Sequence, residues 1–123
     1  MGKGRKKHDD YLEALNLLGK DLARRARSKC ELSEQSGSLR AFDLVGPDSE
    51  PSLEHVVLVS ETVRNHLEGH LSSRDEMRYL ETAVWNQEFA VRKACVRILR
   101  QIKDAWADEA IANAESMGAP LNE

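Results

Sequence analysis

The sequence contains little cysteine, few aromatic residues and no long apolar run. Two cysteines, Cys30 and Cys95, occur among 123 residues, too few for the disulfide framework of a small secreted domain. Aromatic residues make up 5% of the chain, so aliphatic side chains must fill most of the core. No apolar run approaches the roughly 20 residues that cross a bilayer, and no apolar signal segment follows the basic start. We therefore expect a cytoplasmic protein with reduced thiols and no membrane partner; a single Cys30–Cys95 disulfide is the alternative.

The sequence also lacks the motifs of common catalytic and nucleotide-binding sites. No G-x-S-x-G, Walker loop, G-x-G-x-x-G or H-E-x-x-H occurs. The acidic pairs Asp9–Asp10 and Asp108–Glu109 lie in strongly polar segments, which is typical of solvated faces. We therefore expect a protein that is not an enzyme and that carries no cofactor.

Charge is distributed unevenly along the chain, although the formal net charge is only −3. Lys and Arg dominate residues 1–29, whereas Asp and Glu dominate residues 30–72. Cations near the start could contact phosphates of a nucleic acid, but no aromatic residues are interleaved with them for base stacking. A charged, solubilising terminus is the plainer interpretation. The candidate nucleic-acid contacts are Lys3, Arg5, Lys6, Lys7, Arg24, Arg25, Arg27 and Lys29.

Hydrophobic periodicity predicts a mainly helical chain with one pair of short strands. Apolar residues recur at helical spacing from residue 8 to residue 29. Two β-type runs follow, Leu39–Val45 and Val56–Val59, and they could pair antiparallel across the Gly- and Pro-containing loop between them. Ser60 is a plausible N-cap for the next helix.

Two further helices are expected after residue 70. Ser73 and Glu76 fit a capping box at the start of one helix. A single long helix is expected from about Glu88 to Ser116, with Cys95 on its inner stripe as a buried, inert thiol.

These elements predict an α+β, mainly helical fold in one domain. The N-terminal helix leads into a small β-hairpin region, and a C-terminal helical subdomain packs against it. We expect a flexible basic arm over residues 1–7 and a single domain over residues 8–123. The domain divides into a helix (8–29), a hairpin region (30–63) and a helical region (64–117).

Two short tetrads flank the predicted strand pair. Residues 30–33 read Cys-Glu-Leu-Ser and residues 60–63 read Ser-Glu-Thr-Val. If both were C-x-x-C, four thiolates on two turns would form a closed tetrahedral zinc site. Only Cys30 remains as a zinc ligand, because serine hydroxyls bind zinc poorly at neutral pH and valine has no ligand atom.

The chain resembles the PhnA-like proteins, which combine a zinc ribbon with a helical domain. Residues 26–32 match a family segment like S-K-C-E-L-C, and residues 57–62 match its apolar strand leading into C-x-x-C. Together the matches cover roughly residues 22–112. Further matches at family spacing are Arg78-Tyr79-Leu80, Trp85, Ala90-Val91, Arg97-Ile98-Leu99 and Asp104-Ala105-Trp106-Ala107.

The resemblance implies a degenerate zinc-ribbon-like hairpin region that has lost its metal. In the family the four tetrad positions would be zinc cysteines, so Cys30, Ser33, Ser60 and Val63 are vestigial ligand positions that hold no metal. Hydrogen bonding and apolar packing must then replace the folding free energy that zinc supplies in intact sites.

His66, His70 and the thiol of Cys30 are further candidate sites. His66 and His70 are four residues apart, a spacing that can hold a metal on one helical face. Gly69 lies between them, so two exposed histidines near a helix end are expected instead. Cys30 follows Lys29, and a nearby cation can lower the pKa of a thiol, so a reactive Cys30 is the alternative to an inert one.

We expect a non-catalytic protein-interaction or structural module of PhnA-like type, with a protein partner or a homodimer. Trp106, beside the apolar stripe of the last helix, is the candidate interface residue. The alternative is a nucleic-acid-binding accessory protein that uses the basic N-terminal segment. An enzyme acting on phosphonates is suggested only by the family's name, and no residues are present to carry that activity.

Overall fold

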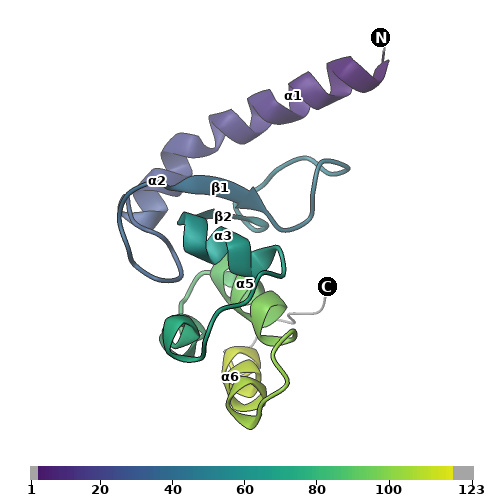
Figure 1. Ribbon diagram of the computed structural model, residues 1–123. Helices are drawn as coiled ribbons and strands as arrows, with labels where there is room; N and C mark the ends of the chain where they lie inside the picture. The colour runs from purple at the N-terminus through teal and green to yellow at the C-terminus, as the bar shows by residue number, and fades with distance from the viewer. Residues whose placement is uncertain (1–2, 118–123) are drawn as a thin grey trace.

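The computed structural model describes residues 3–117 of the chain, with side chains from residue 9 onward. A two-stranded sheet lies between an N-terminal pair of helices and a group of C-terminal helices (Figure 1). In chain order the elements are α1 (Lys3–Leu17), α2 (Gly19–Ala26), β1 (Arg40–Asp43), β2 (Val56–Val59), α3 (Glu61–Leu67), a 3-10 helix η1 (Asp75–Met77), α4 (Tyr79–Ala83), α5 (Phe89–Leu99) and α6 (Ala105–Glu115).

The predicted strand pair is confirmed. β1 and β2 are antiparallel, and Arg40 lies opposite Val59 at one end while Asp43 lies opposite Val56 at the other. Three of the four β2 residues are buried, which suits the stiff, β-branched valine side chains of this strand. The hairpin is therefore short, and packing of β2 rather than strand length stabilises it.

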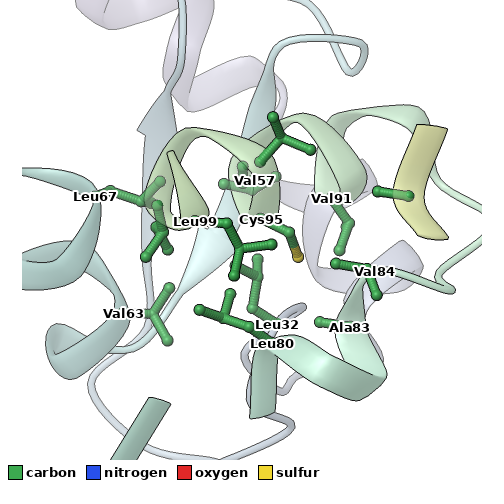
Figure 2. Packing of buried hydrophobic residues seen from close by; sticks show 14 of the residues in the cluster. Leu32, Val57, Val63, Leu67, Leu80, Ala83, Val84, Val91, Cys95 and Leu99 are labelled. Carbon is green, nitrogen blue, oxygen red and sulfur yellow. The ribbon is translucent and has the colours of Figure 1, made fainter. Parts of the chain in front are cut away.

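The core is built around α5. Valine, isoleucine, leucine, alanine and Cys95 on this helix are buried, and β2, α3, α4 and α6 all pack against it. Figure 2 shows Cys95 and Leu99 of α5 facing Leu80 of α4, Val63 of α3 and Leu32 of the loop before β1. The mainly helical α+β fold is thus confirmed, with aliphatic rather than aromatic side chains filling its centre.

The N-terminal segment differs from the single helix over residues 8–29 and from the flexible arm over residues 1–7. α1 already begins at Lys3, and Lys and Arg are good helix formers. The chain turns at Leu18, and α2 starts at Gly19, where the glycine weakens helix continuity. α2 then ends at Ala26, and the next residue, Arg27, adopts a left-handed conformation with φ of 57°. The remaining positions of the expected domain and arm, 1–2 and 118–123, lie outside the described residues.

α1 projects away from the body of the protein (Figure 1). Its middle is attached to β1 by a hydrogen bond of 2.7 Å, which the Tyr11 hydroxyl donates to Oδ2 of Asp43. Burial, followed by this hydrogen bond and the Asp43 charge, raises the pKa of Tyr11 to about 12. Leu17, at the end of α1, is 74% exposed.

The single long C-terminal helix predicted over Glu88–Ser116 is wrong. The chain leaves the helix after Leu99 and starts α6 at Ala105, so α6 folds back to pack against α5. The buried positions of α6 are Ala107, Ala110 and Ala114, and such small side chains let two helices approach closely. One straight helix would have left this alanine face without a partner.

The predicted helix starts are confirmed in part. Ser60 caps α3, since its Oγ accepts a hydrogen bond of 3.3 Å from the Val63 amide. Ser73 does not form the expected reciprocal capping box: its hydroxyl donates to the Glu76 carboxylate, and only the short helices η1 and α4 follow. Over residues 3–117, no helix combines the length and the apolar character that crossing a membrane requires.

Candidate functional site

The two tetrads form turns of the same kind on neighbouring segments. The Ser33 amide donates to Sγ of Cys30 over 3.4 Å, and the Val63 amide donates to Oγ of Ser60 over 3.3 Å. In both turns, an amide therefore bonds to the side-chain atom three residues earlier. Ser33 and Val63 also line one small hollow, which brings the two turns together. Their interpretation as vestigial zinc positions remains a prediction.

A buried ion pair connects the first tetrad, residues 30–33, to α2 and β2. The Arg25 guanidinium donates to both carboxylate oxygens of Glu31, over 2.6 and 2.8 Å. The side chains of Arg25 and Glu31 are only 14% and 3% exposed. Arg25 also donates to the backbone oxygens of Leu53 and Val56, and Glu31 accepts from the Leu58 amide. One ion pair thus joins α2, the first tetrad and β2.

The remaining tetrad side chains lie in an apolar environment. Cys30 and Val63 are buried, and both belong to the main hydrophobic cluster. The Ser33 hydroxyl is buried without a hydrogen-bond partner among the described residues. Within residues 9–117, no group of three or more His, Cys, Asp or Glu side chains is placed to hold a metal ion.

Both thiols are free and buried. Cys95 is fully enclosed by the core, and this burial raises the pKa of its thiol well above the ordinary value. Neither thiol therefore has the exposure of a reactive cysteine, although cations lie close to Cys30.

The predicted basic contacts do not all remain available for a ligand. Arg25 is committed to Glu31, and Arg24 lies 3.8 Å from Asp21 in an exposed pair. Arg27 and Lys29 are exposed and have no carboxylate within 4 Å among residues 9–117. The side chains of Lys3, Arg5, Lys6 and Lys7 lie outside the described ones, although their backbone forms the first turns of α1.

Arg27 and Lys29 lie on a hollow that sequence reasoning missed. We call it the Trp85 hollow; it has a volume of about 600 Å³ and separates the segment 25–34 from the segment 82–88. Trp85 lines it and is 50% exposed. A half-exposed indole therefore shares one concave surface with two free cations, which are 56 or more residues away in the chain.

Trp106, the predicted interface residue, lies elsewhere and is half-buried against the core. The Arg74 guanidinium stacks over its ring at 5.3 Å. Of the two tryptophans, Trp85 has the more exposed side chain. A signal for this was present in the sequence, because Trp85 is followed by Asn86 and Gln87, polar residues that predict a turn at the surface.

The expectation of two exposed histidines is wrong for His66. Its ring is fully buried, with Nδ1 2.7 Å from the Tyr79 hydroxyl and Nε2 2.8 Å from the Ser72 hydroxyl. Burial lowers the pKa of His66, and the Glu76 charge opposes this only in part. His70 lies beyond the end of α3 and is exposed, so the pair does not share a helical face.

Comparison with known proteins finds no matching family model, no similar curated protein and no similar solved structure. The PhnA-like resemblance therefore stays a prediction from the residues that carry it. The function has to be argued from the surface of this chain alone.

Proposed function

We propose that the chain is a non-catalytic accessory protein that binds single-stranded nucleic acid at the Trp85 hollow. The observation that carries this proposal is that a half-exposed indole lines the same hollow as the exposed side chains of Arg27 and Lys29. An aromatic ring next to cations suits a nucleobase and its flanking phosphates. A cytoplasmic location belongs to the same proposal, and free thiols support it.

The size and chemistry of the hollow agree with this ligand. A volume of about 600 Å³ lies within the range of small-ligand sites, roughly 300–1,000 Å³, and so accommodates a base with its sugar. Asn86 and Gln87 line the hollow and supply amide donors and acceptors for base edges.

The acidic residues of the hollow are partly neutralised. Glu31 is paired with Arg25, and one oxygen of Glu88 lies 4.0 Å from the same guanidinium. Glu34 lines the hollow as well and is exposed. The hollow is thus lined by three cations and three carboxylates, and its attraction for phosphate depends on the exposed positions of Arg27 and Lys29 rather than on a net positive charge.

Fluorescence anisotropy with a labelled ten-nucleotide oligo(U) tests the proposal. We expect salt-sensitive binding to the single strand and weaker binding to a duplex, whose bases cannot stack on Trp85. The substitution Trp85→Ala should cost about 1–3 kcal/mol of binding free energy. The double variant Arg27→Gln/Lys29→Gln should reduce the slope of log K against log salt by about 1.4.

Matched controls separate the hollow from general charge. Trp106→Phe should leave binding unchanged, as should the pair Lys20→Gln/Arg100→Gln, which removes two exposed cations elsewhere on the surface. Deleting residues 1–7 measures the contribution of the N-terminal cations. Equal affinity of Trp85→Ala and the wild type would show that the hollow is not the binding surface.

A protein-interaction module that forms a homodimer is the second candidate, and α1 favours it. This helix carries cations over residues 3–7 and the exposed acids Asp9, Asp10 and Glu13 immediately after them. In an antiparallel pair of α1 helices related by a two-fold axis, each basic segment lies opposite the partner copy's acidic segment. Exposed Leu12 adds apolar area.

Sedimentation equilibrium tests this second candidate. A homodimer predicts a mass that rises with protein concentration and a dissociation that increases with salt. Asp10→Lys/Glu13→Lys should abolish it by placing like charges opposite each other. A monomer at all concentrations up to millimolar would exclude it.

A further inference from the structure

A row of cations lies on the face of α5 that meets the hairpin. Phe89, Lys93 and Arg97 are each four residues apart, so they follow one another along a single helix face. Lys93 Nζ lies 3.1 Å from Nδ1 of His55, and Arg97 donates to the backbone oxygen of Leu44. We call three polar side chains the α5 row: Lys93 and Arg97 of α5, and His55, which directly precedes β2.

The α5 row is flanked by aromatic rings. The Lys93 ammonium lies 5.3 Å from the centre of the Phe89 ring, and the Arg97 guanidinium lies 5.2 Å from that of Phe42. These rings hold the two cations in place without neutralising them. Lys93 is buried, whereas Arg97 and His55 are only partly buried and open the row to solvent.

No carboxylate balances the α5 row. Among residues 9–117, neither Lys93 nor Arg97 has an Asp or Glu oxygen within 4 Å. Asp43, next to Leu44 in the chain, is engaged elsewhere, because it accepts from Tyr11 and from the Val45 amide. Buried charges in folded proteins are normally paired, so a buried lysine one helical turn from an arginine favours the approach of an anion.

The hydrogen-bonding groups of the row also suit an anion with several oxygens. Lysine has no acceptor atom, so Nδ1 of His55 must accept from it. With Nδ1 as the acceptor, Nε2 carries the ring N–H and becomes a further donor. The remaining side-chain N–H groups of Lys93 and Arg97 have no protein acceptor among the described residues.

We propose that the α5 row binds a phosphate group through Lys93, Arg97 and His55. This inference goes beyond the proposed function, because the row faces the hairpin and is not part of the Trp85 hollow. The phosphate could belong to a nucleic-acid backbone or to a free phosphate ester, and both present the same oxygens to the row.

Amide and side-chain NMR shifts during titration with inorganic phosphate test the inference, with sodium chloride at equal ionic strength as the reference. We expect saturable shifts at residues 55, 93 and 97 that chloride does not cause. Lys93→Met should weaken binding at least ten-fold, whereas Lys93→Arg should retain it. Lys103→Met removes an exposed lysine after α5 and should change nothing.

The competing ligands identify the source of the phosphate. Displacement by oligo(U) assigns the row to a backbone phosphate, and displacement by glycerol phosphate alone assigns it to a free ester. Trp85→Ala should leave phosphate binding intact, so failure at the Trp85 hollow and failure at the α5 row are distinguishable. Shifts that rise linearly with phosphate, or that are equal in chloride, overturn the inference even if Lys93→Met fails to fold.

Discussion

The Arg25–Glu31 pair should be the main polar contribution to the stability of the hairpin region. Glu31→Gln keeps the shape of the side chain but removes the charge that faces the guanidinium over 2.6 and 2.8 Å. Because both side chains are largely buried, Arg25 then loses its close partner and keeps only the half-exposed Glu88 carboxylate, 4.0 Å away. Breaking such a pair from one side costs about 3–5 kcal/mol, a large part of the total stability of a small domain.

Urea unfolding followed by far-ultraviolet circular dichroism measures this cost. With a slope of about 2 kcal/mol per molar urea, a loss of about 3 kcal/mol lowers the midpoint by about 1.5 M. The double variant Arg25→Met/Glu31→Leu should be less destabilised than the sum of its two single variants, because it leaves no unpaired charge.

The exposed pair Arg24–Asp21 provides the matched control. Asp21→Asn should change the unfolding free energy by less than about 1 kcal/mol, as for other surface pairs. If Glu31→Gln changes it as little as Asp21→Asn does, the pair is not what holds the first tetrad to β2.

Three further predictions concern the interior. The triple variant Ser33→Cys/Ser60→Cys/Val63→Cys should bind one zinc ion, measured by elemental analysis, because both turns already have the required amide-to-side-chain bonds; a metal-free triple variant contradicts the vestigial-site interpretation. His66 has a pKa below 6.5, so its stabilising contribution is present above about pH 6.5 and is lost as pH falls through the folded-state pKa; His66→Gln should flatten this part of the stability–pH curve, and an unchanged curve argues against the assignment. Ellman's reagent should leave Cys95 unmodified until urea unfolds the protein, and rapid labelling under native conditions would show an open core.

Local signals predicted the hairpin and one helix start well. β2 is a run of β-branched and aliphatic residues, and Ser60 directly after it has the side chain that an N-cap requires. Both predictions depend on a few neighbouring residues. The predicted mixture of several helices and one strand pair indicated the fold class, and the structure has this mixture.

Features that depend on distant contacts were not predictable from spacing. The alanines of α6 carry the same helical period whether they continue α5 or fold back on it, so only tertiary packing separates the two cases. The burial of His66 depends on the Tyr79 hydroxyl, and the Trp85 hollow depends on segments 25–34 and 82–88 meeting in space. For the same reason, Arg25 was assigned to a ligand although its charge is used within the fold.

The contacts of Arg25 also determine the order in which parts of the chain can assemble. Arg25 and Glu31 are 6 residues apart, but their bonds to Leu53, Val56 and Leu58 span 27 to 31 residues. The ion pair can therefore become fully enclosed only after β2 has docked. We expect its loss to accelerate unfolding more than it slows folding, so that the pair extends the lifetime of the native state rather than nucleating it.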